Sequence, residues 1–293
     1  MDILPLALVC LAAFLHAGWN FLAKKSGEPT AMLWAVLCAS LILYAPAFLL
    51  RLPQARFAPG AWGFILATGV LHALYFLTLG RAYRAGDLST VYPLARGSAP
   101  LLAAALAAAA LREEISARGG LAILLVAAGI YVTHLRGFAR GDWLAPLRRW
   151  RESGVRWALA TGLLTALYSV VDKAGVSRVS PEIYIYLMFI LTLLLTAPYS
   201  LGGGRAEKIL ALFRSGPSLL RIGAGGLATM GAYGLVLFAM RMSKVSYVVA
   251  AREVSVVLGA ALGVFVLKEG GVRQKMAGAA FIAAGIVLLA LSR

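Results

Sequence analysis

Long apolar runs alternate with short polar segments along the whole chain. An α-helix crosses the ~30 Å hydrocarbon core of a bilayer with about 20 residues, at a rise of ~1.5 Å per residue, and the runs match this length. The pattern therefore predicts ten membrane helices. They are Ile3–Ala23, Thr30–Leu50, Ala61–Tyr83, Ser89–Leu111, Arg118–Leu135, Val155–Asp172, Glu182–Leu201, Leu219–Arg241, Val245–Leu267 and Gln274–Leu291.

The composition places the chain in the same class. Hydrophobic residues make up 61% of the 293 residues, which is more than a soluble domain of this size buries, whereas lipid accepts such a surface. The formal net charge of +16 does not indicate nucleic-acid binding, because the basic residues lie in short clusters between apolar runs. We expect an all-α, multi-pass protein of the cell inner membrane. Its expected partners are the lipid bilayer and a small-molecule substrate.

The longest polar break divides the chain into two parts with five predicted helices each. The parts are residues 1–135 and 155–293, and residues 136–154 connect them. A unit with an odd number of crossings reverses its orientation when it is repeated, so two related parts of this kind form an inverted repeat.

The two parts match at a constant spacing of 156 positions, which supports such a repeat. The corresponding pairs are Arg96 and Arg252, Arg112 and Lys268, Glu113 and Glu269, and Gly129 and Gly285. We therefore predict two inverted five-helix repeats around a central cavity. In this architecture the binding site lies near the membrane midplane.

Charged residues stand well inside two predicted helices. Arg96 lies in the fourth helix, and Arg252 and Glu253 lie in the ninth. A charge at the centre of a membrane helix costs at least ~2.5–3.5 kcal/mol on insertion scales, so it usually faces a partner or a water-filled cavity. Neighbouring residues point about 100° apart on a helix, so Arg252 and Glu253 cannot both point at one spot. We expect these residues to bind substrate or to couple its transport, and a structural ion pair is the alternative.

Two motifs carry a resemblance to a known family. Segment Ala82–Pro100, AYRAGDLSTVYPLARGSAP, precedes the exit LREE at Leu111–Glu114. With ten helices in two halves, the chain resembles the EamA-type branch of the drug/metabolite transporter superfamily over nearly its whole length. The resemblance implies a basket of helices around a central cavity, alternating access, and transport of small metabolites, often export of amino acids or related compounds. Sugar-phosphate exchangers of the superfamily are similar in holding an anion with basic residues on the corresponding helices. The second half departs from the motif, since Glu253 stands where the first half has Gly97.

Polar and aromatic residues recur at helical spacing on several predicted helices. His16, Trp19 and Asn20 share one face of the first helix, and His72 shares a face with Tyr75. Such faces line a cavity or form interhelical hydrogen bonds worth about 0.6–2 kcal/mol each. Aromatic rings hold an ammonium group by cation–π contact and an arginine takes an acidic group, so the set suits a zwitterion or an anion. The predicted substrate-binding residues are His16, Trp19, Asn20, His72, Tyr75, Arg96, Tyr168, Tyr233 and Arg252, and the predicted coupling residue is Glu253.

Enzyme and metal signatures are missing from the sequence. It has no HExxH, Walker or GxSxG motif, and Cys10 and Cys38 lie in apolar runs without the spacing of a metal site. We expect no catalytic residue, no metal ligand and no cofactor. The alternative from another class is an intramembrane hydrolase that pairs Ser98 or Ser255 with His72.

The sequence thus favours a secondary active transporter for a small polar metabolite, zwitterionic or anionic, such as an amino acid or a related compound. We expect an exporter that works by alternating access as a monomer or a weak homodimer, and a lipid flippase on the same fold is the alternative. Proton coupling through Glu253 is a further hypothesis, because burial and a nearby arginine shift the pKa of a carboxyl group in opposite directions. Basic residues are more numerous on the side away from the termini, so the positive-inside rule puts the termini outside. The family resemblance implies cytoplasmic termini instead.

Overall fold

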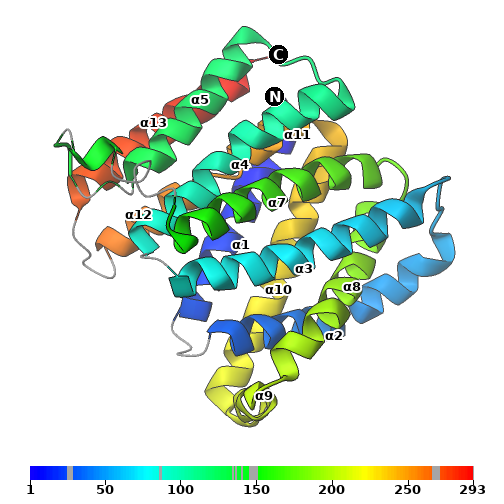
Figure 1. Cartoon of the computed structure of the whole chain (residues 1–293). Helices are drawn as coiled ribbons and strands as arrows, with labels where there is room; N and C mark the ends of the chain where they lie inside the picture. Colours follow the sequence, from blue (N-terminus) through cyan, green and yellow to red (C-terminus); the bar gives the residue numbers. More distant parts are fainter. Residues whose placement is uncertain are drawn as a thin grey trace.

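The structure, a computed structural model, describes residues 1–24, 29–85, 88–133, 135, 137–139, 141–144, 151–265 and 271–292. Within these ranges the chain is largely helical and contains no strand (Figure 1). The helices are α1 (Ile3–Lys24), α2 (Pro29–Arg51), the 3₁₀ turn η1 (Leu52–Gln54), α3 (Ala61–Ala85), α4 (Leu88–Leu111), α5 (Ala117–Thr133), α7 (Ser153–Gly175), α8 (Pro181–Leu201), α9 (Arg205–Arg214), α10 (Gly216–Met242), α11 (Val245–Ala251), α12 (Val254–Phe265) and α13 (Val272–Leu291).

Many of these helices match the dimensions of a membrane. Among the described residues, seven helices are long and apolar enough to cross a bilayer, and α1 and α5 contribute shorter apolar segments. The seven are α2, α3, α4, α7, α8, α10 and α13. They agree with the predicted all-helical, multi-pass membrane protein.

The two chain ends lie together on one face of the molecule (Figure 1). The amino group of Met1 donates hydrogen bonds to the carbonyl oxygens of Leu289 (2.9 Å) and Ser292 (2.5 Å). These bonds fasten the start of α1 to the end of α13. We call the side that holds both ends the terminal face.

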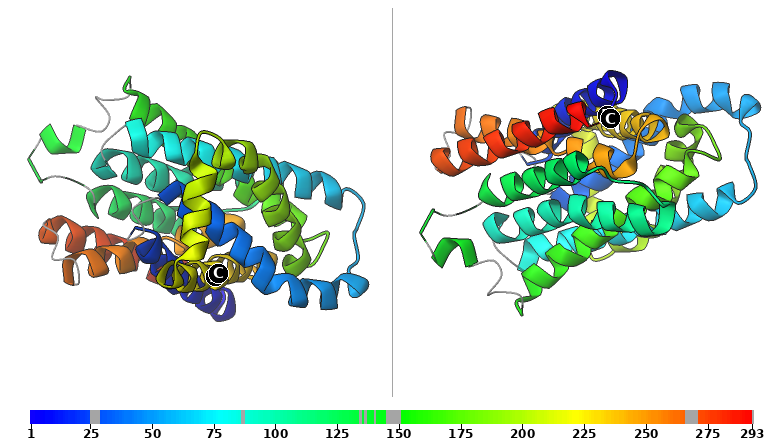
Figure 2. Two further views of the ribbon diagram at one scale, coloured as in Figure 1. Left: turned by 90° about the horizontal axis from the view of Figure 1, so that it is seen from below. Right: turned by 90° about the horizontal axis from the view of Figure 1, so that it is seen from above.

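Helices of the N-terminal part pack chiefly on helices of the C-terminal part (Figure 2). Helix α5 lies along α13, and α4 packs on both α7 and α5. Helix α3 packs on α7 and α8, α1 on α10 and α12, and α2 on α10 and α8. The two parts therefore form one interleaved body.

Glycines allow α5 and α13 to approach closely. A Cβ atom added to Gly129 would lie 2.7 Å from the carbonyl oxygen of Gly278, and one added to Gly285 would lie 2.8 Å from that of Ala122. Since real Cβ atoms do not come this close to backbone, any larger residue at these positions would separate the helices.

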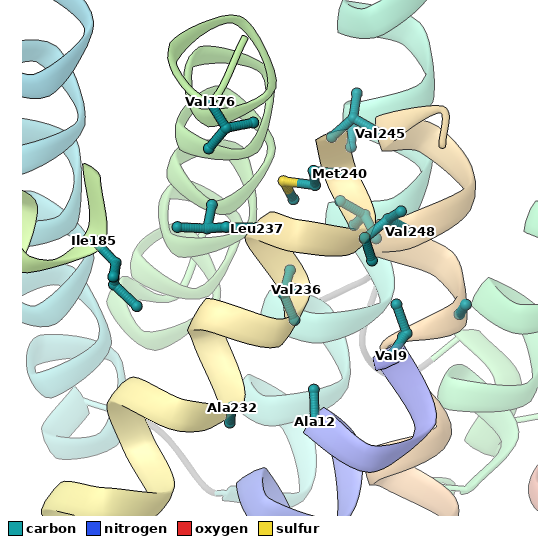
Figure 3. Close-up of a cluster of buried hydrophobic side chains, with 14 of the residues drawn as sticks. Val9, Ala12, Val176, Ile185, Ala232, Val236, Leu237, Met240, Val245 and Val248 are labelled. Atoms are coloured by element: carbon teal, nitrogen blue, oxygen red, sulfur yellow. The ribbon is translucent and has the colours of Figure 1, made fainter. Parts of the chain in front are cut away.

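An apolar cluster surrounds α10 (Figure 3). Its members on α10 are Met230, Ala232, Val236, Leu237, Ala239 and Met240, and they are all buried. The neighbours that pack around them are Val9 and Ala12 of α1, Val176, Ile185 of α8, and Val245 and Val248 of α11. Because lipid is as apolar as these side chains, within the membrane the cluster holds the helices together by close packing.

The predicted continuous helix Val245–Leu267 is wrong, because the chain breaks into α11 and α12 at Arg252 and Glu253. The backbone pattern tightens there: Glu253 N–H bonds to Ala250 C=O (3.1 Å) and Val256 N–H to Glu253 C=O (2.9 Å), both three residues back. This 3₁₀ step interrupts the regular ladder. The break is not caused by proline, because the segment contains none. In contrast, α4 contains Pro93 and Pro100 and is helical throughout.

Charged side chains hold the turn between α10 and α11 from both sides. The carboxylate of Glu113, just after α4, accepts hydrogen bonds from the N–H groups of Val245 (2.7 Å) and Ser246 (3.3 Å). The ammonium of Lys173, near the end of α7, donates to the carbonyl of Met240 (2.5 Å). Each charge complements the helix end that it meets. The short helix α11, which leads to Arg252, is thereby fixed at its start.

Helix α9 lies between the predicted helices Glu182–Leu201 and Leu219–Arg241, in a segment for which no helix is predicted. Ile209 is its buried residue, and Leu212 and Phe213 pack against a cluster that includes Met32 of α2 and Ile222 of α10. Its ten residues are too few to cross a bilayer, and its charged face follows from the sequence RAEKILALFR.

Candidate functional site

An ion pair joins the two halves in the interior. Nη2 of Arg96 on α4 lies 3.0 Å from Oε2 of Glu253, between α11 and α12, and it also donates to the hydroxyl of Ser255 (3.0 Å). Only 1% of the Glu253 side chain and 13% of the Arg96 side chain is exposed. Within the described residues, Oε1 of Glu253 has no hydrogen-bond partner. The carboxylate therefore keeps one oxygen available.

Arg252 is a buried cation without a counter-ion at contact distance among the described residues. Its Nη2 donates to the Tyr168 hydroxyl at 3.3 Å, and its Nε has no partner in that part of the chain. Its neighbour Glu253 pairs with Arg96 instead. An isolated buried charge is unfavourable, so this guanidinium is well suited to bind an anionic group.

Aromatic rings from three helices surround the Arg252 contact. The ring of His72 on α3 stacks on Tyr168 of α7 with centroids 4.1 Å apart. Tyr75 meets the Tyr168 ring edge to face at 5.7 Å, and Tyr233 of α10 does so at 6.2 Å. The structure thus brings together four predicted site residues from separate helices. We call His72, Tyr75, Tyr168 and Tyr233 the aromatic cluster.

A buried carboxylate that is not among the predicted site residues lies beside this cluster. Asp172 is fully buried and accepts hydrogen bonds from the hydroxyls of Thr68 (2.5 Å), Tyr184 (2.8 Å) and Tyr233. Asp172 lies near the end of α7, which continues to Gly175. The available signal was that Asp172 follows Tyr168 by four residues and shares its helix face.

Hydrogen bonds connect the aromatic cluster to this carboxylate. Nδ1 of His72 lies 3.0 Å from both the carbonyl and the hydroxyl oxygen of Thr68, and the Thr68 hydroxyl donates to Asp172. Arg252 and Asp172 therefore contact the same aromatic cluster at different residues, Tyr168 and Tyr233. Such a network is favourable only while its members are satisfied, so it holds four helices in a defined arrangement.

The chain matches the model of one protein family over nearly its whole length. The family model of the EamA-like transporter family matches residues 3–135 and 152–291. The chain belongs to the EamA-like transporter family. The predicted resemblance is thereby confirmed, and the family places the protein among membrane transporters.

The EamA-like chain is similar to a transporter relative in sequence and to a solved structure in fold. A Sinorhizobium protein described as an uncharacterized transporter in the cobO 3′ region is 31% identical over 136 residues, which cover 46% of this chain and 94% of the relative. A crystal structure of another protein has the same fold, with a TM-score of 0.75 and 16% identity over 99% of this chain and 98% of that one. The family and the relative point to a transporter rather than an enzyme.

In this EamA-like protein the remaining predicted site residues all belong to α1. His16 is partly buried and lies within electrostatic range of Arg96 and Arg252. Trp19 and Asn20 lie on the same helix, but their side chains fall outside the described part of the structure.

The hydrolase alternative finds no assembled dyad among the described residues. Ser98 donates to the carbonyl of Leu94 (2.5 Å), and Ser255 accepts from Arg96. His72 bonds to Thr68 and contacts neither serine by hydrogen bond in this part of the chain. These contacts do not position a nucleophile beside a base.

Proposed function

We propose that this EamA-like protein is a secondary active transporter that exports a small zwitterionic or anionic metabolite across the cytoplasmic membrane by alternating access. The observation that carries the proposal is the buried Arg252 guanidinium, which has no ion-pair partner in the described residues and lies against the aromatic cluster. Charged groups inside membrane proteins commonly mark a substrate or ion pathway.

The arrangement of charges favours a zwitterion. Arg96 and Glu253 neutralise each other directly, which leaves Arg252 and Asp172 as separate poles of opposite sign at the aromatic cluster. A substrate carboxylate would bind the Arg252 guanidinium, and its ammonium would meet the ring face of Tyr168 or Tyr233 and the field of Asp172. A substrate with both groups satisfies both poles.

Contacts between α5 and α13 support the inverted repeat, with units at residues 1–135 and 155–293. At the spacing of 156 positions, Gly129 corresponds to Gly285 and Ala122 corresponds to Gly278. The contact between Gly129 and Gly278 therefore corresponds to the contact between Gly285 and Ala122. The two helices run antiparallel, because the later residue of α5 meets the earlier residue of α13. Equivalent helices that run antiparallel are related by an axis perpendicular to them, which in a membrane lies in its plane.

The remaining helix packing supports the same relationship. If α1, α2 and α3 correspond to α7, α8 and α10, and α4 corresponds to α11 with α12, then each contact should recur with its members exchanged. The contact of α4 with α7 has its counterpart in that of α12 with α1, and the contact of α3 with α8 in that of α10 with α2. In alternating access, one unit would rock against the other about the axis that relates them, so the binding site would stay at this axis.

Alternating access requires the buried site to open. Arg252, Glu253, Tyr168 and Asp172 are all buried, so substrate reaches them only after helices separate. The break between α11 and α12 places Arg252 and Glu253 at the junction of two short helices, as in the discontinuous helices of many transporters. Movement of α11 would therefore move the arginine directly.

Glu253 is the proposed proton carrier. In its ionised form it pairs with Arg96, and protonation removes that attraction. Opening to each side in turn would expose the pair to water on that side, so the carboxyl would take up a proton from one phase and release it to the other. An exporter would use this step to exchange an inward proton for an outward substrate.

Transport in proteoliposomes tests the proposed function. A panel of α-amino acids, aminophosphonates and small organic cations is measured by counterflow, and we expect transport of zwitterions or anions but not of the cations. Arg252→Lys keeps the charge but removes the planar fork, so transport should fall sharply while the protein stays folded. Arg118→Lys, at an exposed position on α5, is the matched control and should transport normally. Transport of cations alone, or full activity of Arg252→Lys, would contradict the proposal.

A further inference from the structure

A basic cavity lies on the terminal face, away from the buried charges. Its volume is about 340 Å³, and it is enclosed by the segment after α2, the turn between α7 and α8, and the end of α10. Arg51, Arg56, Arg178 and Arg241 line it, together with a single acidic residue, Glu182. Four positive charges from separate parts of the sequence thus converge on one hollow.

Three of these four arginines have no ion-pair partner in the part of the chain that the structure describes. Within the described residues, Arg51, Arg56 and Arg241 form no ion pair, and Glu182 lies beyond ion-pair distance of every arginine. Like charges gathered around a cavity repel one another and raise the local concentration of anions. The arrangement therefore favours a bound anion.

The cavity has a fixed framework. The N–H of Ala58 donates to the carbonyl of Arg178 (2.9 Å), which ties the segment after η1 to the turn between α7 and α8. The Arg178 guanidinium donates to the carbonyl of Ala174 (2.7 Å) and stacks on the ring of Phe64 at 4.4 Å. Buried Val179 also lines the cavity. Arg178 and the wall at Val179 are therefore already in place before any ligand binds.

We propose that this cavity binds the phosphate group of a molecule with a net negative charge. Guanidinium groups match phosphate oxygens with paired hydrogen bonds, and several arginines around one hollow can engage several oxygens at once. The first turn of α8, which begins at Pro181 beside the cavity, adds the positive end of a helix. The cavity lies where membrane helices end, so the phosphate belongs to an anionic lipid head group or to a soluble phosphate from the adjacent water.

Binding measurements on the delipidated, purified full-length protein test the proposal. The probes are inorganic phosphate and short-chain phosphatidylglycerol, and short-chain phosphatidylcholine is the comparison because its choline is repelled by arginine. We expect at least one anionic probe to bind and its affinity to fall about tenfold or more in Arg56→Gln/Arg241→Gln, which removes two exposed charged contacts. Arg112→Gln/Arg118→Gln removes the same charge from the end of α4 and the start of α5 on the terminal face and should bind as the wild type does.

A second measurement uses only the wild-type protein. Phenylglyoxal modifies accessible arginines, and mass spectrometry reports the extent at each one. The bound probe should protect Arg56 and Arg241 but not Arg112 or Arg118. Binding of phosphatidylglycerol alone assigns the site to a lipid head group, and binding of inorganic phosphate as well assigns it to phosphate in general. If neither probe binds, if phosphatidylcholine binds equally, or if both double variants lose affinity to the same extent, the proposal is overturned.

Discussion

The ion pair between Arg96 and Glu253 predicts a strong energetic coupling. Arg96→Met or Glu253→Met alone leaves the other charge buried without its partner, and such a loss costs about 3–5 kcal/mol. Arg96 and Glu253 form a buried ion pair of this kind, because their charged atoms are 3.0 Å apart and the Glu253 side chain is 1% exposed. The double variant removes both charges and fills the space with unbranched apolar chains, so its stability should equal or exceed that of the wild type.

The free energy of unfolding, measured by denaturant titration in detergent micelles for all four proteins, gives the coupling energy. We expect about 3 kcal/mol or more between the two sites. Arg118→Met applies the same change to an exposed arginine and should alter stability by less than about 0.5 kcal/mol. Effects of the two single variants that add to within about 0.5 kcal/mol would refute the pairing.

Three further predictions follow from the helix contacts and the proposed coupling. Gly129→Ala should cost about 1–3 kcal/mol of unfolding free energy because its Cβ meets α13, whereas Gly120→Ala on the same helix meets nothing within 4 Å and should be neutral or stabilising; equal effects would contradict the close crossing. Glu113→Ala should cost about 1–3 kcal/mol of unfolding free energy and lower transport, because it leaves two buried N–H groups at the start of α11 without their acceptor. Glu114→Ala removes an exposed side chain and should change neither quantity. Equal losses in both variants would argue against a capping role of Glu113. Folded, reconstituted Glu253→Gln should exchange substrate but lose accumulation driven by a pH gradient, and accumulation that persists would exclude it as the proton carrier.

Helix placement was predictable because the bilayer imposes one length on every crossing segment. The predicted start of Ala61 for α3 and the predicted end of Leu111 for α4 both coincide with the structure. The break at Arg252 was not predictable from apolar periodicity, since the flanking residues are apolar on both sides and contain no proline. What separates α11 from α12 is a local change of hydrogen bonding, which hydropathy does not report.

Part of the candidate site followed from helical spacing and part did not. Residues one turn apart share a face, so Tyr75 could be grouped with His72 from the sequence alone. The partners of Asp172 come from α3, α8 and α10, and no local pattern reveals which helices meet. Helical spacing pairs Asp172 with Tyr168 on one helix face, but only tertiary packing shows that this carboxylate is buried and which side chains it contacts.

The central claim is that Arg252 and Asp172 hold opposite ends of one substrate, and ligand truncation tests it most directly. Calorimetry measures binding of a transported zwitterion, of its analogue without the carboxylate and of its analogue without the amine, to the wild type, Arg252→Lys and Asp172→Asn. Arg252→Lys should weaken binding of carboxylate-bearing ligands about tenfold and leave the carboxylate-free analogue unchanged, while Asp172→Asn should affect only ligands with an amine. If both variants weaken all three ligands equally, the two residues support the fold without contacting the substrate, and the claim is wrong.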